Sequence, residues 1–443
     1  EAGELHRDDA ARGRSLAIPQ SCKDAIGRRL DRLSVESNTV LSIASVIGRT
    51  FSHPILDRVC DLPAERVLDA LAEARDARLI TSADEPNHYR FVHALVQESL
   101  YDEIAPGERM RLHARVGEAL AQIHAANLAP MDGEIAYHFA NAAPIGLAEP
   151  AVTHATRAGK RAMDQFAWEA AAQQFERALH AMEFLSEPDV TQRCDLLLDL
   201  GDAQFRTVLD VSDSPVGSDA FLRAAEIARS IGSSERLAHA AIGFAGINLV
   251  RTPGGFTQTA LLEAALAVYP DRHSALYARL LARLGADLRI VPGAEARIEE
   301  ISRSAVELAR KLGDPGVLAY ALSARHVAIW GPDNLEERMS LAQETLQMGK
   351  QAGDLVLQAW AILPLAADAY EAGDRALFDA TLDAQLETAQ RAGIPYFVWA
   401  ARLQSLSRQV LDGRFAEADI GLQQVGGNSK SLVATYFRTL LQF

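Results

Sequence analysis

Residues 79–101 decide the fold of the N-terminal part of this chain, and they read LITSADEPNHYRFVHALVQESLY. A short apolar run, a polar insert that contains Pro86, and an aromatic run together predict a β-hairpin. From Ala94 onward the apolar residues take a helical spacing, so the second strand is predicted to continue directly into a helix. His93 lies at this junction, where the free N–H groups of a helix would meet an anion.

The residues before the hairpin predict a small helical domain. Ser34 is predicted to cap a helix that ends at Gly48, and two further helices are predicted to begin at Pro54 and Pro63. Helices followed by a hairpin form a winged-helix arrangement, which we place at residues 18–105. The last of these helices mixes basic and acidic residues, a face that would gain little from phosphate contacts, so we expect no direct nucleic-acid binding by this chain. These residues are Arg66, Arg75 and Arg78 beside Glu65, Asp69, Glu73 and Asp76.

The C-terminal part of the chain is repetitive. Turns recur about every 40 residues, and a fixed period of this size is typical of a solenoid of repeats. The markers of these turns are Gly232, Arg272, Gly313, Gly353 and Gly393. We therefore predict an all-α chain apart from the small hairpin, with a winged-helix domain followed by an α-solenoid of tetratricopeptide-like helical hairpins at 165–443. Residues 1–17 are interpreted as a linker and 106–164 as a connecting helical segment.

Composition limits the class of protein. The chain has 443 residues, 49% of them hydrophobic, and a net charge of −15, which favours solubility and disfavours non-specific binding to nucleic acid or anionic membranes. Its three cysteines are scattered, no apolar run approaches the length of a bilayer span, and no signal peptide is recognisable, so we expect a cytoplasmic protein without membrane association. The chain begins at Glu1 and ends on an apolar run, and we interpret it as a piece of a longer protein, truncated at both ends.

No catalytic pattern is recognisable in the sequence. A phosphate-binding loop is missing, because Gly159-Lys160 is followed by arginine and lies within a helical stripe. Residues 196–199 superficially resemble a strand that ends in a magnesium-binding aspartate, but they fall in the first helix of a repeat. No serine-hydrolase, zinc-protease or paired-cysteine motif occurs. We therefore predict no catalytic residue, no metal site and no enzyme activity for this chain itself.

Three stretches resemble the STAND signalling ATPases, the group that includes large ATP-binding LuxR-type transcriptional regulators and the ATPase–repeat modules found with class III adenylate cyclases. The stretches are IPQSCKDAIGRRLDRLS at 18–34, LSIASVIGRTF at 41–51 and FVHALVQESLY at 91–101. The resemblance covers roughly 18–179. It implies that the full-length protein binds ATP or ADP, although this chain itself is expected to hold no cofactor.

The resemblance also implies a role for His93. In these ATPases a histidine at this place contacts the phosphates of bound ADP and holds the resting state, so His93 is a candidate nucleotide-sensing residue. The alternative is that His93 caps its own helix or packs under the hairpin.

The first helices of the repeats carry a second set of candidate residues. The inner face of such helices lines the groove of a solenoid, and aromatic residues and arginine are the usual anchors of partner binding. The same spacing also fits the core of the repeats, so both interpretations stay open for these side chains. They are Arg279, Arg283, Arg289, Tyr320, His326, Trp330, Trp360 and Trp399.

Together these features favour the interpretation that this chain is the sensor and regulatory region of a STAND-type signalling protein. Among such proteins, a LuxR-type transcriptional regulator is the first choice. Its partner would be a protein or a small-molecule inducer bound by the solenoid, with oligomerisation on activation. Two alternatives are the regulatory region of an ATPase-linked adenylate cyclase and a freestanding tetratricopeptide scaffold protein.

Overall fold

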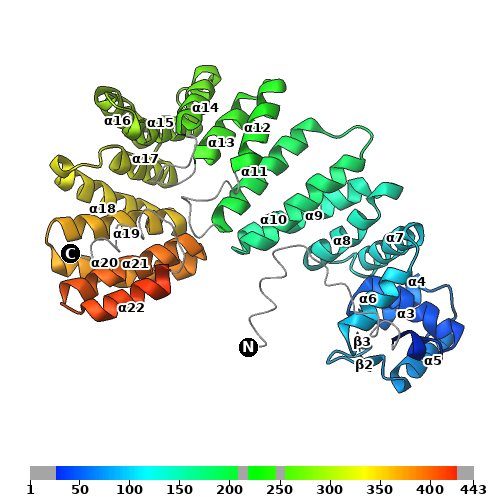
Figure 1. Cartoon of the computed structure of the whole chain (residues 1–443). Coiled ribbons are helices and arrows are strands. Elements are labelled where there is room, and N and C mark those ends of the chain that lie inside the picture. Colours follow the sequence, from blue (N-terminus) through cyan, green and yellow to red (C-terminus); the bar gives the residue numbers. More distant parts are fainter. Residues whose placement is uncertain (1–25, 208–217, 246–254, 427–443) are drawn as a thin grey trace. The chain divides into compact units, whose positions relative to one another are not determined.

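The computed structural model describes residues 26–207, 218–245 and 255–426 (Figure 1). These residues are helical apart from one three-stranded sheet. Contacts between Cα atoms divide them into two units. The first contains the described residues up to Arg157 together with His180–Ser186, and the second contains Ala158–Leu179 and the described residues from Glu187 onward. The division falls inside two helices, α9 (Ala148–Asp164) and α10 (Trp168–Ala181).

The first unit begins with helices that alternate with short strands. The sheet has the strand order β1-β3-β2, and both pairings are antiparallel. The predicted hairpin is formed by β2 and β3, and β3 leads into α6 within three residues. In chain order the elements are α3 (Val35–Ile47), β1 (Thr50–Ser52), α4 (His53–Val59), α5 (Ala64–Asp76), β2 (Ile80–Ser82), β3 (His88–Phe91) and α6 (Ala94–Glu103).

Local chemistry explains where these elements begin and end. The Ser34 hydroxyl accepts a hydrogen bond from the Ser37 amide at 3.1 Å, which caps α3, and Gly48 ends this helix as the sequence predicts. Strand β1 was not predicted, because three residues are too few to show a period of two. It exists through pairing with β3, where the buried rings of Phe51 and Phe91 lie 5.3 Å apart.

The first unit continues through α7 (Pro106–Ile123) and α8 (Asp132–Asn141) into α9, with short turns η1 (Ala129–Met131) and η2 (Ala143–Ile145) between them. Helix α7 buries Leu112, Val116 and Leu120 and contacts both α3 and α4. Residues 106–157, which we predicted as part of a separate connecting segment, therefore pack with the first unit. The reason is the apolar face of α7, which has the N-terminal helices as its partner.

From α11 (Val190–Thr207) to α22 (Phe415–Gly426) the second unit is a series of helices in which each one packs against the next. The predicted turn glycines have left-handed backbones, with φ of +73° at Gly313 and +65° at Gly393, and each ends a helix. The predicted linker at 1–17 and the end of the predicted solenoid at 427–443 lie outside the described residues. The helices are α10 (Trp168–Ala181), α11 (Val190–Thr207), α12 (Ser218–Ser230), α13 (Ser234–Ala245), α14 (Gly255–Val268), α15 (Ala275–Asp287), α16 (Glu295–Leu312), α17 (Pro315–Ala328), α18 (Leu335–Gln351), α19 (Leu355–Glu371), α20 (Arg375–Ala392), α21 (Pro395–Leu411) and α22 (Phe415–Gly426). The short turns are η3 (Met182–Phe184), η4 (Leu288–Ile290) and η5 (Pro332–Asn334).

Close helix packing depends on glycines that face phenylalanine rings. A Cβ atom placed on Gly201 of α11 would lie 2.8 Å from Cζ of Phe221 in α12, closer than real Cβ contacts allow. Gly159 faces the ring of Phe175 in the same way. The missing side chain therefore lets a buried aromatic ring fill the space between two helices.

Gly201→Ala is expected to lower the free energy of unfolding of the second unit by about 1–3 kcal/mol, because the added methyl group forces the Phe221 ring to move. Urea unfolding followed by circular dichroism measures the change. Gly107→Ala is the matched control, since a Cβ there meets nothing within 4 Å and alanine favours a helix. Equal effects of the two substitutions would contradict the packing explanation.

Candidate functional site

His93 lies where the sequence predicts, between β3 and α6. It is the N-cap residue of α6, with an extended backbone at φ −127° and ψ 137°, and its side chain is exposed and makes no capping hydrogen bond. The backbone around it is fixed, because the Val92 amide donates to the Leu79 carbonyl at 3.0 Å and the Val96 amide donates to the His93 carbonyl at 3.1 Å. The imidazole neither caps its own helix nor packs under the hairpin.

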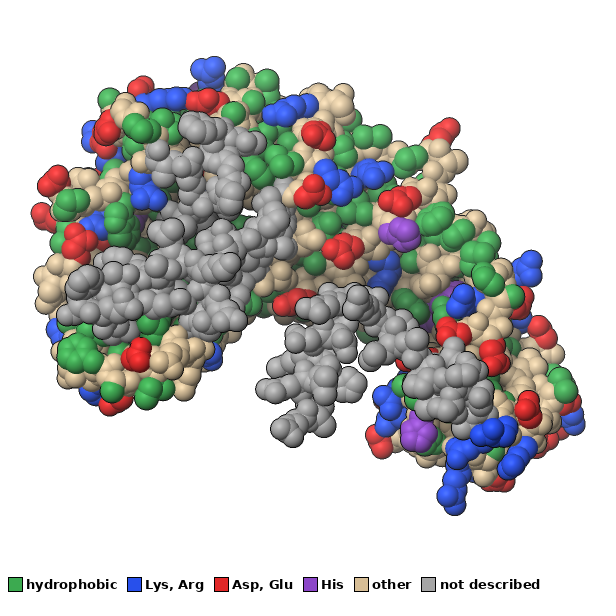
Figure 2. Space-filling model, viewed as in Figure 1, with side chains coloured by type: hydrophobic (Ala, Val, Ile, Leu, Met, Phe, Trp, Pro, Cys, Tyr) green, Lys and Arg blue, Asp and Glu red, His purple; other side chains and the backbone are tan. Residues whose placement is uncertain are grey.

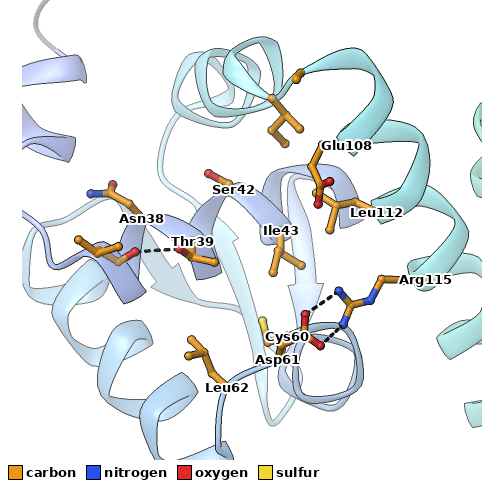
Figure 3. Close-up of a pocket in the computed structure, with 13 residues that line it drawn as sticks. Asn38, Thr39, Ser42, Ile43, Cys60, Asp61, Leu62, Glu108, Leu112 and Arg115 are labelled. Atoms are coloured by element: carbon orange, nitrogen blue, oxygen red, sulfur yellow. Dashed lines mark hydrogen bonds and ion pairs between the residues drawn. The ribbon is translucent and has the colours of Figure 1, made fainter.

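The first unit has a cavity of about 630 Å³ that the sequence did not predict (Figure 3). It lies between α3 and α7, and its remaining walls are the segments that follow α4 and α6. Its residues come from three separate stretches of the chain, 35–43, 60–62 and 104–115, so no local pattern could have revealed it. They are Val35, Asn38, Thr39, Ser42, Ile43, Cys60, Asp61, Leu62, Ile104, Ala105, Glu108, Leu112 and Arg115.

The charged groups of this cavity are largely neutralised. The Arg115 guanidinium donates to both carboxylate oxygens of Asp61, at 3.0 and 2.6 Å, and these bonds hold the pKa of Asp61 below its usual range (Figure 3). Burial raises the pKa of the Cys60 thiol to about 11, so this sulfur is protonated at neutral pH.

A buried pair of histidines joins α7 to α8. The Nδ1 atoms of His113 and His138 lie 2.9 Å apart, and the Tyr101 hydroxyl lies 3.0 Å from Nε2 of His113. If the Tyr101 hydroxyl donates, His113 carries its proton on Nδ1 and donates it to His138, which then carries its own proton on Nε2. Burial lowers the pKa of His113 to about 4 and that of His138 to about 3, so both rings are neutral at pH 7.

In the second unit, two of the predicted groove residues belong to the core. Trp360 and Trp399 are only 3% and 6% exposed, and both lie in one hydrophobic cluster with Phe397. The ring of Phe397 meets that of Trp360 edge to face at 5.0 Å. For these two tryptophans the structure agrees with the core interpretation of the helical spacing.

Three other predicted groove residues come together between α15 and α17. The Arg279 guanidinium lies 5.9 Å from the centre of the Tyr320 ring, and both side chains are half-buried. Arg283 is buried one turn further along α15 and donates to the carbonyl oxygen of Ala245. Arg289 is exposed in η4. Arg279 and Tyr320 are therefore in contact with each other and only partly exposed.

Of the remaining two predicted residues, His326 belongs to a buried charged cluster and Trp330 lies beside that cluster. Nε2 of His326 in α17 lies 2.7 Å from Oδ2 of Asp368 in α19, and Nη1 of Arg338 in α18 lies 3.0 Å from Oδ1 of the same carboxylate. Arg338 also pairs with Glu371, and its guanidinium lies 4.7 Å from the ring of Trp330, which is 41% exposed. We name His326, Arg338 and Asp368 the buried triad. Sequence analysis missed Arg338 and Asp368, although an aspartate among alanines in an apolar helix was an available signal.

Surface charge in the described residues is mixed. Figure 2 shows acidic and basic side chains interspersed over much of the displayed face. On α5, Arg66 pairs with Glu36 at 2.6 Å, and Glu73 accepts hydrogen bonds from Ser34. These ion pairs and hydrogen bonds occupy part of the charged face of α5 that was considered for phosphate binding.

Among the described residues, no group of three histidine, cysteine, aspartate or glutamate side chains is close enough to hold a metal ion. None of the described helices combines the length and the apolar composition that are needed to cross a bilayer.

Comparisons with known proteins gave no match to a protein-family model and no match to a curated protein. Similar solved structures include a signal transduction ATPase with numerous domains, a STAND protein with a tetratricopeptide repeat sensor from Pyrococcus horikoshii, at 15% identity and a TM-score of 0.36. The match covers 93% of this chain and 52% of that one, so this chain spans about half its length.

Two further structures are similar over nearly their whole length. One is a Rap protein complexed with competence and sporulation factor, at 11% identity and a TM-score of 0.37, with 95% of this chain and 97% of that chain covered. The other is aspartyl phosphate phosphatase F from Bacillus subtilis, at 12% identity and a TM-score of 0.33, with 93% and 94% covered. We base the functional proposal on the residues and contacts of this chain.

Proposed function

We propose that this chain is the sensor and regulatory region of a STAND-type ATP-dependent signalling protein, a LuxR-type transcriptional regulator. In this proposal residues 18–105 form a winged-helix domain, and the repeats of the second unit bind an inducer or a partner protein. The observation that carries the proposal is the exposed His93 at the junction of a hairpin with α6, in the element order α3-β1-α4-α5-β2-β3-α6.

The geometry of this junction suits a contact with phosphate. The imidazole stands at the N-terminus of α6, where the helix dipole favours an anion, and the backbone that carries it is held by the sheet. In the full-length protein, His93 would donate a hydrogen bond to the phosphates of bound ADP and so stabilise the resting state. An inducer on the repeats can release that state only if it binds the active arrangement more tightly than the resting one.

Substituting His93 with alanine is expected to raise the output of the full-length protein without inducer by about tenfold. A hydrogen bond to a charged group contributes roughly 1.5–3 kcal/mol, and about 1.4 kcal/mol shifts an equilibrium tenfold. A transcriptional reporter measures this basal output. His88→Ala is the matched control, because His88 lies on the same hairpin but contacts the Pro86 carbonyl at 3.0 Å, away from α6. Basal output unchanged by His93→Ala would count against the proposed lock.

A freestanding repeat scaffold and the regulatory region of an ATPase-linked adenylate cyclase are the alternatives. The intact mass and terminal sequences of the protein, as its native cell makes it, separate all three. A mass near the 48.0 kDa of this chain supports the scaffold. A larger protein with a phosphate loop supports the signalling ATPase, and its other terminal domain, a helix-turn-helix or a cyclase, identifies the output.

A further inference from the structure

Trp168 makes a contact that a simple array of hairpins does not predict. In such arrays each repeat contacts its neighbours in the sequence. Trp168 is the first residue of α10, yet its indole N–H donates to the carbonyl oxygen of Gly393 at 3.1 Å, across a separation of 225 residues. The indole is 5% exposed and belongs to the same hydrophobic cluster as Ile394 and Phe397. The contact therefore joins α10 to the turn between α20 and α21.

Two neighbours hold the indole in place. The Phe166 ring meets it edge to face at 5.4 Å, and the Arg206 guanidinium lies 5.1 Å from its centre. Phe166 has φ of +59°, a left-handed backbone that a phenylalanine rarely adopts, and its ring is 46% exposed. This backbone ends α9, because the Ala167 amide donates to the Ala162 carbonyl at 2.9 Å and the Phe166 amide donates to the Met163 carbonyl at 3.1 Å.

The contact is specific to this turn. Gly313 and Gly353 have the same left-handed backbone as Gly393, but a Cβ atom placed on either would meet nothing within 4 Å. A Cβ atom on Gly393 would lie 3.7 Å from Cβ of Phe166. The repeat itself therefore does not require the contact.

We propose that Trp168 and Gly393 form a releasable latch within the repeat unit. The latch consists of one neutral hydrogen bond and the packing of one indole against the cluster that contains Ile394 and Phe397, so opening it breaks that hydrogen bond and exposes the indole. It also follows directly after α9, the helix that runs from the first unit into the second. Opening the latch frees the start of α10. A ligand that binds the open form more tightly than the closed form therefore changes how α9 continues into α10.

Closure of the latch is tested with a pair of cysteines. In Phe166→Cys/Gly393→Cys the two Cβ atoms lie within the range of a disulfide, whereas Phe166→Cys/Gly353→Cys is the matched control. Both proteins also carry Cys22→Ser, while Cys60 and Cys194 are buried. With oxidised glutathione we expect the first pair to form its disulfide at least tenfold faster than the control, as followed by intact mass. Equal rates would show that the contact does not exist in solution.

Release is tested on the same protein by amide hydrogen exchange. If the latch opens, oxidation of Phe166→Cys/Gly393→Cys is expected to slow exchange in residues 393–401 at least tenfold relative to the reduced protein. The equivalent turn at 353–361 serves as the internal reference and is expected to be unchanged. Exchange in 393–401 that is the same in both redox forms would overturn the proposal that the contact is releasable.

Discussion

Arg338→Met is expected to lower the free energy of unfolding of the repeat unit by about 3–5 kcal/mol. Arg338 and Asp368 are both fully buried, and their closest charged atoms lie 3.0 Å apart. Without the guanidinium, the Asp368 carboxylate stays in the core with His326 as its remaining partner in the triad. A buried charge that loses its partner keeps its whole desolvation cost, and this cost is what destabilises the variant.

Urea unfolding followed by tryptophan fluorescence measures this effect, since all four tryptophans lie in the second unit. The matched control is Arg310→Met, because Arg310 pairs with Glu344 at the surface and is 53% exposed, so its loss is expected to cost less than about 1 kcal/mol. The double variant Arg338→Met/Asp368→Leu removes both charges and is expected to recover much of the lost stability. If Arg338→Met cost no more than Arg310→Met, Arg338 would not be the group that compensates the buried carboxylate.

Local chemistry made much of the fold predictable from the sequence. Ser34 and Gly48 mark the ends of α3, Pro86 lies in the hairpin turn, and the glycines at the repeat turns have the left-handed backbone that the period implies. The position of His93 between a strand and a helix followed from the change of hydrophobic period at Ala94. Each of these signals lies within a few residues of the feature that it predicts.

The missed features depend on contacts between distant residues. His113 and His138 are 25 residues apart, and His326 and Asp368 are 42 apart, so each pair requires two helices to pack before it exists. A charged residue on a helix is usually solvated, and nothing local distinguishes a buried Arg338 from an exposed one. The cavity between α3 and α7 was missed for the same reason.

The first unit is expected to lose up to about 4 kcal/mol of stability between pH 7 and pH 5 through His113 and His138. The pKa values are about 4 and about 3 in the folded protein, against an ordinary value of 6.5. Below pH 6.5 the unfolded chain binds a proton at each ring, while the folded protein binds none until the pH approaches 4. Acid therefore favours unfolding, and at pH 5 each ring contributes about 2 kcal/mol to this loss.

The two units can be followed separately in this experiment. The first unit holds none of the four tryptophans, so a urea transition that appears in circular dichroism but not in tryptophan fluorescence belongs to it. His113→Gln/His138→Gln cannot take up these protons and is expected to flatten the dependence between pH 6.5 and pH 5. His180→Gln is the control, because His180 is exposed and its substitution is expected to leave the slope unchanged. A double variant as acid-sensitive as the original protein would assign the sensitivity to other groups and would mean that the buried rings are protonated without unfolding.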